Sequence, residues 1–422
     1  DGTLPIEMAV VALPCHMATS RRTDDYQSFQ YLKQGPDYKH YDLASELDRV
    51  PPTEVPLTAT EEERVDRLTR EFVMVSMHDH PNRFPDDISE TPRYVKDGHI
   101  STAYEGLAHS SWHCVFDNLL DGICTIESSS GWKWTEVLHD IGMRLCDIAH
   151  QDFVVPAISV SDILEARDRG TVAWVATLEG AAPIENELDR LDILFGFGVR
   201  SIGVTYNEAN HLGCGLRENN DSGLTNFGHR AIRRMNQLGM LIDCSHCGDQ
   251  TTLDAIAASE KPIVLSHIGA RALWNTNRMA PDDVLRACAE KGGVIGIEAA
   301  PHTTLTESHP THDIESVMEH FEYIVDLVGV DHVGFGADTT YGDHVGIHQL
   351  YAAAFTFDEL DPSQETQTPP DFEHVDYVRG LENPTESSHN IVRWLVKHGY
   401  SDDKIEKVMG ANALRVLDEV WV

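Results

Sequence analysis

Short, continuously apolar segments alternate with longer amphipathic stretches through most of this chain, and this alternation limits its fold more than any other feature. The apolar segments are residues 172–178, 201–205, 240–243, 262–266, 293–297 and 332–336. Strands of a parallel sheet are buried on both faces, so their sequences are apolar throughout instead of alternating. Between these segments, residues 227–238 place apolar side chains at helical spacing. The pattern predicts an α/β fold with a parallel sheet.

The length of the chain favours one large barrel with additions. Its 422 residues exceed the usual size of a single hydrophobic core, but a (β/α)8 TIM barrel holds about 250 or more residues as one domain. We therefore expect such a barrel over residues 61–422. Residues 1–60 are polar and contain several prolines, which predicts an N-terminal arm. Residues 339–374 depart from the repeat, and we expect this C-terminal insertion to form a lid or a contact within a homo-oligomer.

Composition argues against several classes of partner. The chain carries 69 acidic and 32 basic residues, a formal net charge of -37, and such a field repels nucleic acid and anionic membranes. We expect neither as a partner, and no apolar stretch reaches the length of a membrane span. Eight irregularly spaced cysteines indicate reduced thiols and a cytoplasmic protein. Of these, Cys244 and Cys247 are expected to pack beside a strand end rather than to bind structural zinc.

Side chains that can bind metal follow the apolar segments. His78 and His80 come after the β-like residues 72–75, at the alternate spacing that directs two strand side chains to one face. In a (β/α)8 barrel the functional side chains lie at the carboxyl ends of the strands. The residues at these positions are His78, His80, Glu179, Tyr206, His246, His267 and Asp338. Their joint placement predicts a metal centre.

The donor set suits two divalent ions, and zinc fits it best. Imidazole nitrogen and carboxylate oxygen are common zinc ligands. If Glu179 bridges the ions, His78 and His80 complete one site, whereas His246 and His267 complete the other. Such a pair can deprotonate a shared water, whose proton Asp338 would accept. By position alone four further histidines could also serve as ligands, namely His109, His302, His344 and His348.

Several motifs beyond the single ligands resemble those of a known family, the membrane (renal) dipeptidases, peptidase family M19 of the amidohydrolase superfamily. The resemblance extends from about residue 68 onward. It rests on residues 178–180, 223–228, 238–246, 266–267, 277–283, 331–338 and 410–416. It implies that Glu179 is the bridging carboxylate, that His246 and His267 hold the second ion, and that Asp338 is the catalytic aspartate. It also implies that Arg278 binds the carboxylate of the substrate, a role that suits a planar, permanently charged group.

Two departures from the family pattern make this chain an atypical member. His80 stands where the family usually has an aspartate, which makes the first metal site richer in histidine and less anionic. Tyr206 stands where the family usually has the histidine that polarises the substrate carbonyl. A tyrosine hydroxyl can still donate a hydrogen bond to an oxyanion, although it carries no charge. His211, five residues further on, could take over this role if its loop folds back.

We weigh three hypotheses of function against these features. The first is a metal-dependent, dipeptidase-like hydrolase that cleaves an amide bond next to a free carboxylate in a small substrate. The second keeps the barrel and the metal but acts on a non-peptide metabolite as a specialised amidohydrolase, deaminase or lyase, and the departures at His80 and Tyr206 motivate it. The third is a non-catalytic binding protein, which has no use for Asp338 beside two metal sites.

Overall fold

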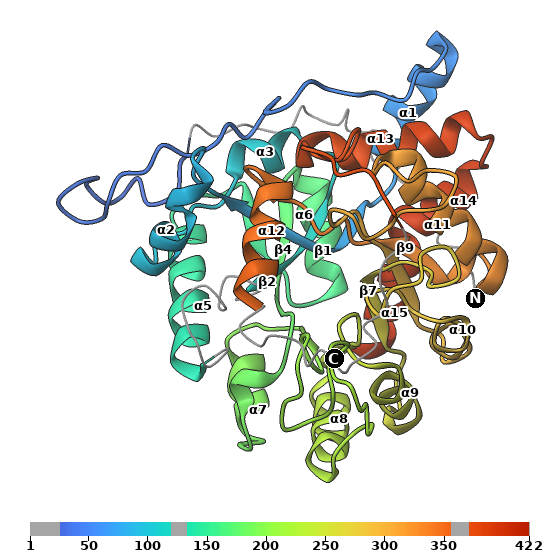
Figure 1. Cartoon of the computed structure of the whole chain (residues 1–422). Helices are drawn as coiled ribbons and strands as arrows, with labels where there is room; N and C mark the ends of the chain where they lie inside the picture. The colour runs from blue at the N-terminus through green and yellow to red at the C-terminus, as the bar shows by residue number, and fades with distance from the viewer. Residues whose placement is uncertain (1–25, 120–132, 356–370, 422) are drawn as a thin grey trace, which may run out of the picture.

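The computed structural model describes residues 26–119, 133–355 and 371–421, and their strands form one parallel sheet curled into a barrel (Figure 1). The strands are β1 Val75–Arg83, β2 Cys114–Leu119, β3 Val154–Pro156, β4 Val172–Leu178, β5 Ser201–Gly203, β6 Leu241–Asp243, β7 Val264–Ile268, β8 Val294–Ile297, β9 Val333–Phe335 and β10 Thr340–Tyr341. Their order is β10-β1-β2-β4-β5-β6-β7-β8-β9, and β3 pairs only with β4.

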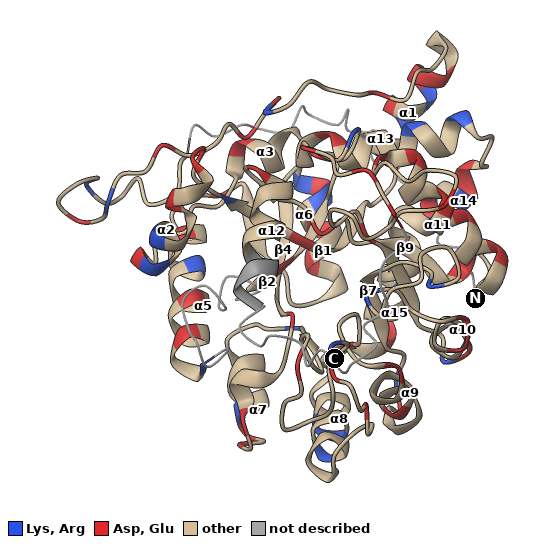
Figure 2. Ribbon diagram, in the orientation of Figure 1, with Lys and Arg blue, Asp and Glu red and all other residues tan. Residues whose placement is uncertain are grey.

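Helices surround this sheet on the outside (Figure 1). They are α1 Ala59–Glu71, α2 Thr91–Asp97, α3 Tyr104–His109, α5 Trp134–Ile148, α6 Val160–Arg169, α7 Arg190–Gly196, α8 Asn226–Leu238, α9 Asp249–Ala258, α10 Asp282–Glu290, α11 Ile314–Val328, α12 His344–Phe355, α13 Pro384–Lys397, α14 Asp402–Glu406 and α15 Asn412–Val420. Acidic residues are spread over many of the outer helices, including α5 and α10 (Figure 2).

The barrel closes through the segment that contains β9 and β10. β9 pairs with β8, whereas β10, a few residues later, pairs with β1. Between them the amide of Asp338 donates to the carbonyl of His78 at 3.1 Å, and the amide of His80 donates to the carbonyl of Thr339 at 3.1 Å. With β9 and β10 taken as one interrupted strand and β3 set aside, eight strands form the closed sheet. The prediction of a (β/α)8 barrel is confirmed.

The local sequence explains the boundaries of α8, which matches the helix predicted over residues 227–238. The side chain of Thr225 precedes the helix and accepts a hydrogen bond from the amide of Gly228 at 2.9 Å. Gly239 ends it with φ +74°, a left-handed conformation that glycine adopts without a steric penalty. Ala231, Ile232 and Met235 form its buried side.

The strand that carries His78 and His80 is longer than its apolar residues 72–75 indicate. β1 begins at Val75 and continues through both histidines to Arg83. The strand extends because Thr340 pairs with His80 and Tyr341 pairs with Arg83. This partner comes from more than 250 residues away in the sequence, so local hydropathy carries no sign of it.

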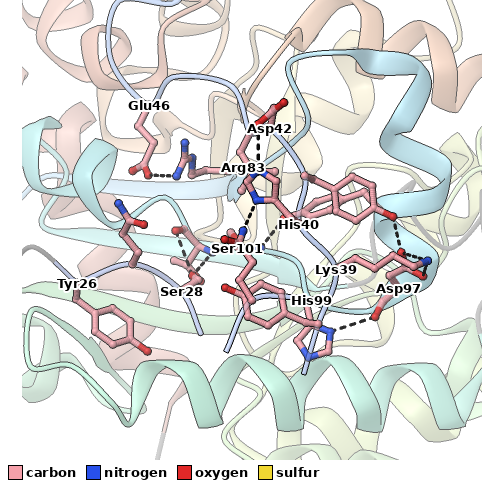
Figure 3. A pocket seen from close by; sticks show the side chains of 17 residues that line it. Tyr26, Ser28, Lys39, His40, Asp42, Glu46, Arg83, Asp97, His99 and Ser101 are labelled. Carbon is pink, nitrogen blue, oxygen red and sulfur yellow. Dashed lines mark hydrogen bonds and ion pairs between the residues drawn. The ribbon is translucent and has the colours of Figure 1, made fainter. Parts of the chain in front are cut away.

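The described part of the expected arm, residues 26–58, runs along the barrel without forming a named helix or strand; residues 1–25 lie outside the described residues. Between this segment, α2 and the end of β1 lies a polar cavity of about 360 Å³ (Figure 3). Its charged groups pair with one another, as in Lys39 with Asp97 at 2.7 Å and Arg83 with Glu46 at 3.1 Å. Polar contacts around this cavity therefore attach residues 26–58 to the barrel.

The predicted insertion at residues 339–374 contains β10 and α12, whereas residues 356–370 lie outside the described part of the chain. On α12, Ile347 packs in an apolar cluster with Phe84, Tyr94 and Val95. After the undescribed residues, Phe372 packs against a second cluster formed by Trp274, Met279 and Leu305. The role of residues 339–374 as a lid or an oligomer contact remains a prediction.

Candidate metal centre

The carboxyl ends of the strands bring six of the seven predicted strand-end side chains into one buried group. His78 and His80 lie within β1, His267 lies within β7, and the others follow directly or closely after β4, β6 and β9. These six residues are His78, His80, Glu179, His246, His267 and Asp338, all between 0 and 7% exposed. Charged or polar groups this deeply buried need partners. Among the described residues these six side chains form two groups of potential metal ligands, and two further, overlapping groups include Asp243 and Glu298.

The first group consists of His78, His80 and Asp338, whose ligand atoms lie within 4.8 Å of one another. Asp338 Oδ1 lies 3.0 Å from Nε2 of His80 and 3.2 Å from Nε2 of His78. The backbone of Asp338 has φ +57°, in the left-handed region that non-glycine residues seldom adopt. This turn between β9 and β10 places the carboxylate against the two imidazoles of β1, and such conformations are concentrated at functional sites.

The second group consists of Glu179, His246 and His267. Oε1 of Glu179 lies 2.8 Å from Nε2 of His246 and 3.3 Å from Nε2 of His267. The same oxygen lies 3.7 Å from Nε2 of His78, and the rings of His78 and His267 stack with centroids 3.4 Å apart. Glu179 is therefore the carboxylate that stands between the two groups.

Three of the histidines contact polar side chains through Nδ1, the ring nitrogen that faces away from the centre. Nδ1 of His246 lies 3.0 Å from Oδ1 of Asn207, and Nδ1 of His78 lies 2.7 Å from the amide of Asn118. Nδ1 of His267 lies 2.8 Å from Oγ of Ser266, which in turn donates to Asp243. These contacts fix the rings with Nε2 directed toward the centre. Asn207 and Ser266 can accept the proton of Nδ1, whereas the side-chain NH2 of Asn118 faces Nδ1 of His78 as a donor. Sequence analysis missed Asn118, Asn207 and Ser266 as contributors.

Burial keeps these imidazoles neutral. Burial lowers the pKa of His246 and His267 well below the usual value, and the charge of Arg278 adds to the effect. Burial also lowers the pKa of His78. For Asp338, burial favours a higher pKa, but hydrogen bonds with His78 and His80 outweigh it and hold the pKa well below its usual range. Neutral imidazoles and an ionised carboxylate are the forms that bind divalent metals, so the residues present fit such an ion.

Tyr206 lies beside this centre rather than within it. It is half-buried, and its ring stacks on His246 with centroids 4.4 Å apart and planes at 21°. His211 is exposed on the loop before α8. Of the four further histidines, His344 is buried, and burial lowers its pKa to about 4. None of those four belongs to a ligand group among the described residues.

Arg278 reaches the centre from the loop between β7 and α10. Its Nη1 donates to the carbonyl of Ser245 at 3.3 Å, and its Nη2 donates to the carbonyl of His267 at 3.2 Å. Nη2 also forms an ion pair with Oε2 of Glu298, which directly follows β8 and is fully buried. The sequence offered a signal for Glu298, because this residue directly follows the apolar segment 293–297 and so occupies a strand-end position.

Cys244 and Cys247, expected to pack rather than to bind metal, are buried within the main apolar cluster. No cysteine belongs to a ligand group in the described ranges.

Comparison with known families decides the relationship of this chain. Residues 64–350 match the sequence model of the membrane dipeptidase family, peptidase family M19. The chain belongs to this family. Family membership implies a divalent metal cofactor, for which the two ligand groups provide the donors.

Individual relatives agree with this placement. The chain is 29% identical to an uncharacterized protein in the pqqA 5' region of Klebsiella pneumoniae, over 68% of this chain and 92% of that protein. It is 28% identical to the dipeptidase tcpJ of Claviceps purpurea over 67% of this chain, but it spans only 58% of that relative's length. An amidohydrolase structure from Pseudomonas aeruginosa has a TM-score of 0.67 at 22% identity, covering 85% of this chain and 99% of that one. This structural likeness shows the fold.

Within the described residues, no helix combines the length and apolar character needed to cross a membrane.

Proposed function

We propose that the protein is a metal-dependent, dipeptidase-like hydrolase that cleaves an amide bond next to a free carboxylate in a small substrate. The observation that carries this proposal is the pair of buried ligand groups that meet at Glu179. Two ions, with zinc as the best fit, would bind there. His78 and His80 would hold one ion, His246 and His267 the other, and Glu179 both.

When bound, two divalent ions polarise a carbonyl group and make a water molecule acidic enough to act as a nucleophile near neutral pH. The protein contributes the proton acceptor, because the ionised carboxylate of Asp338 faces the same space as the imidazoles of β1. Asp338 would take the proton of the attacking water and deliver it to the leaving amine. Arg278 would anchor the carboxylate of the substrate.

A panel of dipeptides, including L-D forms, tests this proposal directly. The purified protein is stripped of metal, reloaded with zinc or another divalent ion, and assayed for release of free amino acids. We expect turnover that disappears on stripping and returns on reloading. If the metal-loaded protein cleaves none of the dipeptides, the peptidase assignment is wrong.

The hydroxyl of Tyr206 is the proposed donor to the oxyanion, and Tyr206→Phe removes only this group. Phenylalanine retains the ring that stacks on His246, so we expect unchanged metal content. The loss of one donor to a developing oxyanion should lower kcat by about 100- to 1000-fold while KM changes little. Steady-state kinetics and metal analysis of the variant check this. An unchanged kcat would remove Tyr206 from the reaction.

A second candidate function is hydrolysis of a non-peptide metabolite. It is favoured by His80 and Tyr206, and by the ion pair in which Glu298 already occupies Arg278. The double variant His80→Asp with Tyr206→His restores the usual family residues at both positions. If it gains dipeptidase activity that the parent lacks, the second function is favoured. A parent that is already fast on dipeptides makes this alternative unnecessary.

A further inference from the structure

The carboxylate of Glu298 is held firmly beside Arg278. Glu298 is 0% exposed, and its amide donates to the carbonyl of Ile268 at 3.3 Å. Its own carbonyl accepts a hydrogen bond from Oγ1 of Thr304 at 3.1 Å. With the backbone fixed in this way, the side chain reaches Nη2 of Arg278. Glu298 also lies close enough to His267 and Asp338 for their ligand atoms to form one group.

The hydrogen bonds of Arg278 leave no free edge for a second carboxylate. A guanidinium group has five N–H donors, and a carboxylate binds it best through two parallel N–H groups on one edge. Both hydrogens of Nη2 are engaged, one by Glu298 and one by the carbonyl of His267. One hydrogen of Nη1 is engaged by the carbonyl of Ser245. The remaining donors, Nε–H and one hydrogen of Nη1, lie on different edges of the group.

We propose that Glu298 is a specificity-determining residue that competes with the carboxylate of the substrate for Arg278. This inference rests on the proposed function, in which Arg278 anchors that carboxylate. A two-point contact requires displacement of either the His267 carbonyl or Glu298. The carbonyl belongs to β7, whereas the carboxylate of Glu298 is at the end of a side chain. Glu298 is therefore the group that must give way. Burial raises the pKa of Glu298 to about 8 although the charge of Arg278 acts to lower it, so its negative charge is complete only above that pH.

As a consequence, the parent protein should bind a ligand with a free carboxylate only slightly more tightly than the same ligand with a carboxamide. The carboxylate gains a charged contact with Arg278 but must break the existing pair with Glu298. The carboxamide gains less and can leave the pair intact. Removing the charge of Glu298 should strengthen binding of the carboxylate selectively.

Calorimetric binding of two non-hydrolysable ligands tests this inference without relying on turnover. The ligands are a phosphinate analogue of a dipeptide and its C-terminal carboxamide, each titrated at about pH 9, above the raised pKa of Glu298, into metal-loaded parent protein and into Glu298→Gln. We expect the variant to bind the carboxylate about tenfold more tightly than the parent, a change of about 1.4 kcal/mol. The Kd of the carboxamide should stay within about twofold. Metal content is measured in both proteins, because Glu298 shares a candidate ligand group with His267 and Asp338. Equal metal content is expected, and loss of metal in Glu298→Gln would make Glu298 a ligand and overturn the inference.

Glu382→Gln is the matched control, because Glu382 is also a buried carboxylate paired with an arginine, Arg49, at 2.5 Å. It should leave both Kd values unchanged. If Glu298→Gln binds the carboxylate no more tightly, or less tightly, Glu298 does not compete and the inference is wrong.

The parent protein alone gives a second test should Glu298→Gln fail to fold. Its two Kd values should differ by less than about tenfold, and a preference above about 100-fold for the carboxylate would overturn the inference. Failure of the proposed function has a different signature. If neither ligand binds, both proposals fall, whereas binding without the effect of Glu298 overturns only the competition.

Discussion

Glu179→Gln is expected to lower kcat by at least about 100-fold and to reduce the amount of bound metal. Oε1 of Glu179 lies within 4 Å of Nε2 of three histidines from both ligand groups, His78, His246 and His267. Glutamine keeps the size of the side chain but replaces the proposed anionic ligand with a neutral amide. If Glu179 is shared by two ions as proposed, its loss should remove several kcal/mol of stabilisation from the metal-dependent transition state. Elemental analysis and kinetics with added metal measure the two effects.

Glu46→Gln provides a control for the loss of a buried carboxylate. Glu46 is 8% exposed and pairs with Arg83 beside the polar cavity, and burial raises its pKa. Its replacement should leave metal content and kcat unchanged, although it can lower the melting temperature. Full activity and full metal content in Glu179→Gln would contradict the bridging role. A loss of metal in both variants would indicate a general defect of folding.

The strand-end rule located most of the candidate site from the sequence because the ends of parallel strands meet at one edge of the barrel. Apolar segments fix where each strand ends, and thereby place Glu179, His246 and Asp338 near one another. The same rule applied to residues 293–297 would have included Glu298. Arg278 came only from the family resemblance, since it lies late in the loop between β7 and α10 and not at the end of a strand.

The partners of the histidines could not be predicted in the same way. Asn207 reaches His246 from a loop that follows β5, and the path of this loop depends on packing between distant segments. The full length of β1 depends on β10, which is supplied by the end of the barrel. Local sequence patterns describe the burial of a segment, but they do not identify its partner across such separations.

The packing of the predicted insertion, residues 339–374, also could not be predicted from local sequence patterns. The insertion's departure from the repeat was visible in the sequence, and its described parts pack in two different apolar clusters, through Ile347 and Phe372. Those contacts depend on apolar residues of α2 and of the loop that carries Arg278. The sequence therefore indicated an interruption of the repeat, but not the surfaces on which its described parts pack.

Asp338→Asn is expected to lower kcat by about 100- to 10,000-fold, the usual contribution of a positioned proton-transfer group. Asparagine has nearly the same size and tolerates the left-handed backbone at φ +57°, so we expect the fold to be preserved. Its amide cannot accept the proton that the ionised carboxylate takes in the proposed reaction. Kinetics on the best dipeptide and elemental analysis of the same sample check this result.

Metal content separates the two roles that the geometry allows for Asp338. As a proton acceptor, Asp338 affects kcat but not metal binding; as a ligand in the group with His78 and His80, it affects both. Asp147→Asn is the matched control, because Asp147 is 1% exposed and accepts hydrogen bonds from Tyr26 and Tyr104 outside the metal centre. It should lower stability but not kcat. Unchanged activity in Asp338→Asn would exclude the proton-transfer role, whereas parallel loss of metal and activity would assign Asp338 to the first metal site.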